Sequence, residues 1–298
     1  MHTRQLTALL LALALALLCG CGGTAAPAAS APEVAEPALP GPEPTPEPTP
    51  EPTPEPLRPD LTAKPALIAH GGGEIYGFRL TNSLEALDEA YARGHRFIEV
   101  DVSRTADGDL VLLHDWESMA ARMLGAEGVC TKADFLNAEA FAGLTLLDLN
   151  GLLDWLAAHR DCSVITDLKC DDYLLPLRIL RVRAGELTEN FIPQIYNWSD
   201  YDAVAAMGYP RILLTFYRLS LDLPRLADYL ETHALWAVTV AQDRLSEALL
   251  DTVRAAGTDT AVYAHTVNDY YVYETWQPKG LTGIYTDYFA PEGWPENN

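Results

Sequence analysis

The chain has 298 residues, with 20 lysines and arginines against 42 aspartates and glutamates, and a formal net charge of −22. This length suits one large domain or two small ones. The excess of acidic residues argues against nucleic-acid binding and against binding of anionic lipids through a basic surface. It suits instead a domain that concentrates cations.

Residues 1–21 predict a lipoprotein signal peptide. A short basic start precedes an apolar run that is too short for a stable transmembrane helix. The final letters LCGC resemble a bacterial lipobox, with Cys21 as the residue that becomes lipidated. Cys19 fits less well, because Leu18 stands where a small residue is wanted. An ordinary cleaved signal is the alternative. Lipidation would place the protein outside the cytoplasm, anchored to the bacterial cell membrane.

Residues 22–61 predict a disordered linker rich in Pro, Glu and Thr. Its PEPTPEPTPEPTPEP segment repeats every four residues and has almost no apolar side chain to bury. Proline favours an extended polyproline II form, so these roughly 40 residues would span up to about 120 Å at ~3.1 Å per residue. A spacer through an envelope layer and a merely tolerated linker predict the same structure.

Residues 62–298 predict one α/β domain of alternating strands and helices. This alternation indicates parallel strands with right-handed crossovers, and over about 230 residues it favours a closed (β/α)8 TIM barrel over an open doubly wound sheet. Strands are expected at 66–71, 97–103, 110–115, 163–169, 191–196, 211–217, 236–241, 260–267 and 283–289, and helices at 82–94, 147–160, 174–184, 201–207, 223–233, 245–257 and 270–276.

These are nine strands for eight places in a barrel. The link RTADGD, at residues 104–109, is too short for a parallel crossover, so strands 97–103 and 110–115 should form a hairpin. A turn centred on Asp107–Gly108 would place Asp101 opposite His114, about 5 Å apart at Cβ.

Cysteine contributes no metal motif to this domain. Cys162 and Cys170 bracket one predicted strand, about 25 Å apart if extended, so they cannot pair with each other. With Cys130 they make an odd number, which leaves at least one free thiol. All three are expected to be structural.

Polar side chains cluster where the predicted strands end, which is the end that builds the active site in TIM barrels. Glu99 and Asp101 are two apart and therefore face the same side of one apolar strand. Two buried carboxylates need neutralisation, which a divalent cation supplies well. With Asp167 as a third oxygen ligand, the set suits Ca²⁺ or Mg²⁺. The alternative is salt bridges to nearby cations: Arg79, Arg104 or Lys169.

Six segments resemble, in order and spacing, the glycerophosphodiester phosphodiesterase family: AHGGG, TNSLEAL, GHRFIEVDVSRTADGDLVLLHD, ITDLK, HTVN and IYTDYF. The resemblance covers residues 66–289. It implies a TIM barrel related to phosphatidylinositol-specific phospholipase C, and metal-dependent hydrolysis of a glycerophosphodiester to glycerol 3-phosphate and an alcohol. It further implies that His70 and His114 form the acid/base pair and that Glu99 and Asp101 bind the metal.

The chain departs from the family pattern at several positions. Gly71 stands where the family has a phosphate-binding Arg, and Asp167 stands where it usually has a Glu. These changes bear on the substrate more than on the chemistry. Three cations are candidates to replace the missing guanidinium: Lys169, Arg79 and Arg218.

Three residues are expected to contact substrate: Lys169, Gln194 and Tyr196. For Gln194 and Tyr196 a barrel-lining role is equally compatible with the pattern. The N-cap of the helix at 82–94 is expected at Asn82 or Ser83, and for Asn82 capping is preferred over a substrate contact.

The main hypothesis is therefore a lipid-anchored phosphoric diester hydrolase. One alternative is a non-catalytic lipoprotein that binds phosphorylated polyols or wall polymers on a degenerate barrel, and another is a phosphodiesterase of the phospholipase C type.

Overall fold

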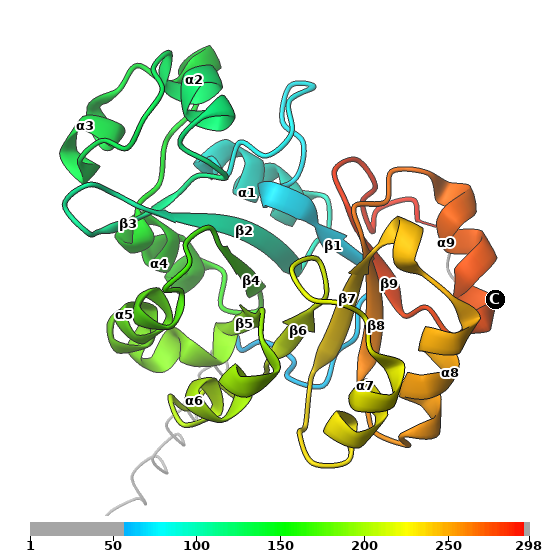
Figure 1. Cartoon of the computed structure of the whole chain (residues 1–298). Helices are drawn as coiled ribbons and strands as arrows, with labels where there is room; N and C mark the ends of the chain where they lie inside the picture. The colour runs from blue at the N-terminus through cyan, green and yellow to red at the C-terminus, as the bar shows by residue number, and fades with distance from the viewer. Residues whose placement is uncertain (1–56, 295–298) are drawn as a thin grey trace, which may run out of the picture. The chain divides into compact units, whose positions relative to one another are not determined.

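The computed structural model describes residues 57–294, in which a nine-stranded sheet closes on itself and carries its helices on the outside (Figure 1). All pairings are parallel except that of β3, and closure comes from β1, which pairs with both β9 and β2. The predicted TIM barrel is confirmed. The parallel strands are β1 Leu67–Ala69, β2 Phe97–Arg104, β4 Ser163–Leu168, β5 Phe191–Ile195, β6 Leu213–Thr215, β7 Ala237–Ala241, β8 Ala261–His265 and β9 Gly283–Thr286.

Seven of the helices were expected from the apolar periodicity. They are α1 Leu84–Ala92, α4 Leu149–Ala158, α5 Leu174–Ala184, α6 Tyr201–Ala205, α7 Leu223–Leu230, α8 Glu247–Ala255 and α9 Tyr270–Trp276. Each begins near its predicted residue, and each packs an apolar face against the sheet. In α7, for example, Leu226, Tyr229 and Leu230 are buried. Short 3-10 segments lie at His70–Gly72, Phe141–Gly143, Gly185–Asn190, Trp198–Asp200, Gln242–Arg244 and Gln277–Lys279.

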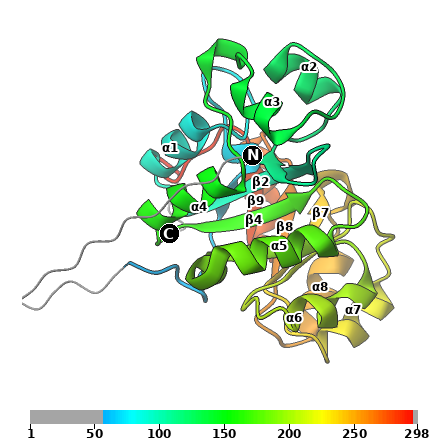
Figure 2. The same ribbon diagram turned by 90° about the vertical axis from the view of Figure 1, so that its left-hand side faces the viewer.

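Helices α2 (Ser118–Leu124) and α3 (Lys132–Asn137) were not predicted. They lie side by side in both views (Figures 1 and 2), and Figure 1 shows them near β3. Met119, Met123 and Phe135 from these helices share a small apolar cluster with Val111 and Leu113. Helices of six or seven residues have too few turns to show a readable period, and packing on this cluster stabilises them.

The barrel interior has an apolar half and a polar half. Interior positions near the strand N-termini are filled by side chains such as Phe97, which stacks on Trp236 with ring centroids 5.6 Å apart. Two residues later, the same faces carry polar groups. The pairs are Phe97 and Glu99, Ile165 and Asp167, Ile192 and Gln194, Leu213 and Thr215, Tyr263 and His265, and Tyr285 and Asp287. The period of two thus places the polar layer at the strand C-termini.

The hairpin between β2 and β3 (Leu110–Leu112) forms, but its predicted register is wrong. Val102 pairs with Leu112, and the Gly108 N–H donates to the Thr105 carbonyl at 2.9 Å. The loop therefore has three residues and ends on Gly108 at φ +84°, as in a turn followed by a glycine bulge. The extra residue places Leu113, whose N–H donates to the Asp101 carbonyl at 3.1 Å, where His114 was expected.

The predicted signal peptide, Cys21 and most of the predicted linker lie outside the described residues. Within 57–294, no helix combines the length and the apolar character needed to cross a bilayer. The thiols of Cys130, Cys162 and Cys170 are free, in line with the expectation that Cys162 and Cys170 do not pair.

Candidate active site

Three carboxylates converge on the barrel axis from neighbouring strands. Glu99 and Asp101 come from β2 and Asp167 from β4, where Asp101 and Asp167 are register partners. One oxygen from each lies within 4.8 Å of the others, and all three residues are buried. The sequence predicted this cluster because the three residues occupy interior positions at strand ends.

Lys169 neutralises part of this negative charge. Its Nζ lies 2.9 Å from Asp101 Oδ1 and 2.6 Å from Asp167 Oδ2. Burial alone would lower the pKa of Lys169, but Asp101 and Asp167 outweigh it and raise that pKa. Of the salt bridges left open by the sequence, this one forms, whereas Arg79 pairs with Asp287 at 3.3 Å.

Glu99 is the least compensated member of the cluster. Its Oε2 accepts one hydrogen bond, from the Gly71 N–H at 2.7 Å. Burial and the adjacent Asp101 raise its pKa to about 8. Three carboxylates facing one ammonium group leave an excess of negative charge, and their oxygens are the ligands that hard divalent cations prefer. The residues present therefore fit a hard divalent cation.

Asp167 is held by two tyrosines as well as by Lys169. Its Oδ1 accepts from the Tyr196 hydroxyl at 2.6 Å and from the Tyr217 hydroxyl at 2.9 Å. Burial would raise the pKa of Asp167, but Lys169 and the two hydroxyls lower it overall. The Tyr196 oxygen also accepts the Leu168 N–H at 2.7 Å, so this hydroxyl both donates and accepts within the protein.

Asn82 supports Asp101 and does not cap α1, so of the two predicted caps Asn82 is wrong and Ser83 is confirmed. Its Nδ2 donates to Asp101 Oδ2 at 2.8 Å, and its Oδ1 accepts the Asp101 N–H at 2.9 Å. The cap is Ser83, whose Oγ accepts the Ala86 N–H at 3.3 Å. A left-handed backbone at Asn82, with φ of 49°, turns its side chain toward β2.

His70 follows β1 and lies beside the acidic cluster. Its Nδ1 is 2.8 Å from Asp287 Oδ1, and its side chain is 22% exposed. Burial lowers the pKa of His70, but the bond to Asp287 and the charges of Glu99 and Asp101 raise it to about 9. Asp287 is itself held by Asn268, whose Nδ2 donates to Oδ2 at 2.6 Å.

His114 follows β3 and is bonded to a different acid. Its Nδ1 lies 2.8 Å from Asp115 Oδ2, and its side chain is 35% exposed. Asp115 also accepts the Met119 N–H at 2.9 Å at the start of α2. Within the described residues, no hydrogen bond or ion pair joins His114 to the acidic cluster. The structure thus groups His70 with the three acids and places His114 two residues beyond the end of β3.

A small polar cavity of about 30 Å³ lies among these groups. Three of its atoms are buried without a hydrogen-bond partner: Thr215 Oγ1, His265 Nε2 and Tyr285 Oη. Buried polar atoms normally have a hydrogen-bond partner, and a cavity of this size has room for about two waters. The remaining lining residues are His70, Glu99, Asp167, Gln194 and Tyr217. Gln194 therefore faces the site, as predicted from its strand-end position.

Sequence reasoning missed three supporting groups: the Gly71 N–H, Asn268 and Tyr217. The last had a readable signal, because Tyr217 is two residues beyond Thr215 and so continues the inward face of β6. The Gly71 N–H had none, because a backbone donor is set by the chain path and not by residue type.

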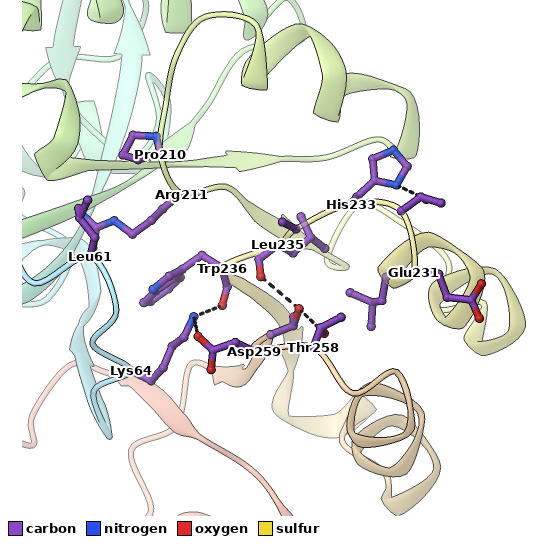
Figure 3. Close-up of a pocket in the computed structure, with 14 residues that line it drawn as sticks. Leu61, Lys64, Pro210, Arg211, Glu231, His233, Leu235, Trp236, Thr258 and Asp259 are labelled. Atoms are coloured by element: carbon purple, nitrogen blue, oxygen red, sulfur yellow. Dashed lines mark hydrogen bonds and ion pairs between the residues drawn. The ribbon is translucent and has the colours of Figure 1, made fainter.

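A much larger cavity, of about 450 Å³, lies at the other end of the barrel (Figure 3). It is lined by residues that precede β6, β7 and β8, including Arg211, Trp236 and Thr260. Lys64 donates to the Trp236 carbonyl at 2.7 Å, and Arg211 donates to Ser163 Oγ and the Glu189 carbonyl. Both cations therefore bond groups of the protein itself, and we interpret this end of the barrel as one that stabilises the fold.

Fold and site together define a TIM barrel with an acidic, histidine-flanked site at the C-terminal ends of its strands. Residues 71–168, which include all three acids, match the model of the Glycerophosphoryl diester phosphodiesterase family. The predicted resemblance to that family is confirmed over this segment.

Individual proteins agree with this. The chain is 35% identical over 113 residues to a Mycobacterium tuberculosis protein named "Probable glycerophosphodiester phosphodiesterase 2", and the match spans 37% of this chain and 40% of that protein. An Oleispira antarctica phosphodiesterase, solved in complex with the product sn-glycerol-3-phosphate, is similar in fold with a TM-score of 0.59 and 20% identity, over 75% of this chain and 93% of that one. A glycerophosphodiester phosphodiesterase from Thermotoga maritima gives a TM-score of 0.58 and 18% identity, over 74% and 94%.

Proposed function

We propose that the chain is a divalent-metal-dependent phosphoric diester hydrolase that converts glycerophosphodiesters into glycerol 3-phosphate and an alcohol. The observation that carries this proposal is the buried cluster of Glu99, Asp101 and Asp167 beside the His70–Asp287 pair. The family match and the fold shared with a phosphodiesterase that holds sn-glycerol-3-phosphate support it.

The three acids would hold the cation, which supplies Lewis-acid polarisation of the phosphodiester when bound. Lys169 forms ion pairs with Asp101 and Asp167, and Asn82 fixes the orientation of Asp101. Glu99 and Asp101 both project from β2, so the β-strand presents two ligand groups on one rigid element. The tyrosine hydroxyls on Asp167 restrict the third ligand in the same way.

Both histidines bond an aspartate through Nδ1, and they differ in that His70 also faces the charges of Glu99 and Asp101, which favours opposite proton transfers. Asp287 stabilises the charged form of His70, so His70 holds a proton at neutral pH and donates it to the leaving alcohol. Asp115 accepts from Nδ1 of His114, which leaves Nε2 free to take a proton from the attacking hydroxyl. That hydroxyl belongs to water, or to the glycerol moiety if a cyclic phosphate forms first.

The test is a coupled glycerol-3-phosphate assay on the purified full chain with sn-glycero-3-phosphocholine as substrate. We expect release of glycerol 3-phosphate that stops with EDTA and returns with added Ca²⁺ or Mg²⁺. A phospholipase C type of enzyme would instead release diacylglycerol from a phosphoinositide. Absence of glycerol 3-phosphate with every divalent cation would contradict the proposal.

The ion pairs of Lys169 favour a second candidate, a barrel that binds phosphorylated polyols without hydrolysis. Its Nζ sits between Asp101 and Asp167, at distances of 2.9 and 2.6 Å, and so offers charge neutralisation without a metal. Isothermal titration of the full chain with Mg²⁺ and with Ca²⁺ separates the two candidates. Hydrolysis requires a bound cation, whereas the binding protein would take up glycerol 3-phosphate in EDTA and leave diesters intact.

For the N-terminal region we propose lipidation at Cys21 and attachment to the outer face of the bacterial cell membrane. The support is the LCGC segment after the apolar run. Expression in a bacterium fed a labelled fatty acid should label the wild-type chain and a Cys19→Ser variant but not a Cys21→Ser variant. Equal labelling of wild type and Cys21→Ser would contradict this assignment.

A further inference from the structure

The candidate site presents an electrostatic problem for the substrate proposed above. A phosphodiester is an anion, and the site contains three clustered carboxylates with Asp287 close by. A cation in addition to the metal is needed to bring such a substrate in. We propose that Arg218 is this cation and that its guanidinium binds the phosphoryl oxygens of the substrate, an assignment that rests on the proposed function.

Two other candidate cations, Lys169 and Arg79, are already engaged. Lys169 is ion-paired with Asp101 and Asp167, and Arg79 is ion-paired with Asp287. Arg218, in contrast, forms no ion pair with any carboxylate in residues 57–294. Its charge is therefore available to an incoming anion.

Arg218 is held close to the metal-binding acids by two aromatic rings. Its guanidinium carbon lies 4.6 Å from the centroid of Tyr196 and 5.2 Å from that of Tyr217. The hydroxyls of the same two rings donate to Asp167 Oδ1. The guanidinium thus lies beside the two rings whose hydroxyls bond Asp167, and these cation–π contacts restrict its movement.

The loop that carries Arg218 is also fixed. The Leu219 N–H donates to the Phe216 carbonyl at 3.2 Å, so Tyr217 and Arg218 occupy the centre of a turn. Arg244 donates to the carbonyls of both Phe216 and Leu219. Because the turn is held in place, little conformational entropy is lost when the guanidinium binds a ligand. The planar guanidinium can also donate to two phosphate oxygens at once.

The test compares Arg218→Gln with a matched control, Arg225→Gln. Arg225, near the start of α7, is exposed like Arg218 and also lies over an aromatic ring, 5.0 Å from the centroid of Trp198, but that ring forms no hydrogen bond with the three acids in residues 57–294. In the presence of Mg²⁺, we expect Arg218→Gln to weaken binding of inorganic phosphate and to raise KM for sn-glycero-3-phosphocholine by about 10- to 100-fold. Arg218→Lys should recover part of the loss, and Arg225→Gln should match wild type.

The outcomes separate this inference from the proposed function. If Arg218→Gln binds phosphate as wild type does and keeps its KM, Arg218 is not the phosphate ligand, whether or not the wild type hydrolyses diesters. If wild type releases no glycerol 3-phosphate but Arg218→Gln alone loses phosphate binding, the hydrolase proposal fails and the assignment of Arg218 stands. Circular dichroism and thermal unfolding of each variant distinguish lost binding from lost fold, with Arg218→Lys as the second variant.

Discussion

The two ends of the barrel differ in how their charged groups are satisfied. At the N-terminal end, Lys64 and Arg211 border a cavity of about 450 Å³ and donate to carbonyls and a hydroxyl of the protein. At the C-terminal end, the cavity is only about 30 Å³, yet it is bordered by clustered carboxylates and by polar atoms with no partner. Unpartnered atoms occur at both ends, since Arg211 Nε also lacks a partner, so the clustering of carboxylates, and not the size of the cavity, marks the C-terminal end as the site for chemistry.

The strongest test of this comparison removes charge from the acidic cluster. The double variant Glu99→Gln/Asp101→Asn keeps the shape but removes two ligand charges. We expect kcat/KM to fall by about 10⁴-fold, because a metal's stabilisation of the transition state is worth several kcal/mol and each 1.36 kcal/mol is tenfold. Metal titration should show no Mg²⁺ binding. Retained binding would mean that the cation is held elsewhere.

Replacing the histidines should have the next largest effect. His70→Ala and His114→Ala should each lower kcat by about 10²–10⁴-fold with the fold intact, since acid–base catalysis contributes that range. Steady-state kinetics with circular dichroism would check this. Because His114 bonds to Asp115 and not to the acids, full activity of His114→Ala alone would leave His70 as the one histidine in the mechanism.

The His70–Asp287 pair makes stability depend on pH at the C-terminal end. The pKa of His70 is about 9 when folded, above its ordinary value of 6.5. Its stabilising contribution is therefore complete below pH 6.5 and is lost as pH rises toward 9. In EDTA, urea denaturation should show the unfolding free energy falling across that window, and Asp287→Asn should flatten the fall. A flat wild-type profile would contradict the pair's role.

The smallest effect on activity is expected at the opposite end. Arg211 is 3% exposed and bonds Ser163 Oγ at 3.0 Å and the Glu189 carbonyl at 2.7 Å. Arg211→Met should cost about 1–3 kcal/mol of unfolding free energy, because these partners lose a donor, while kcat/KM stays unchanged. Chemical denaturation and the coupled assay would measure both. A large loss of activity in a folded variant would show that the two ends are coupled.

Much of the architecture was predictable from local pattern. The alternation of strands and helices indicated the barrel, because each amphipathic segment carries its own period. The same period of two placed Glu99 and Asp101 on the inward face of β2 and Asp167 at the matching height of β4. The hairpin was predictable too, since its link is too short for a crossover.

The tertiary structure decided how those groups are partnered. A three-residue turn ending at Gly108, and not a two-residue one, moved His114 away from the position opposite Asp101. His70 meets Asp287, 217 residues away, only because β1 closes the barrel against β9. Local sequence sets which face a residue occupies, but register and closure depend on the packing of the whole sheet, and a one-residue change in register changes every cross-strand partner.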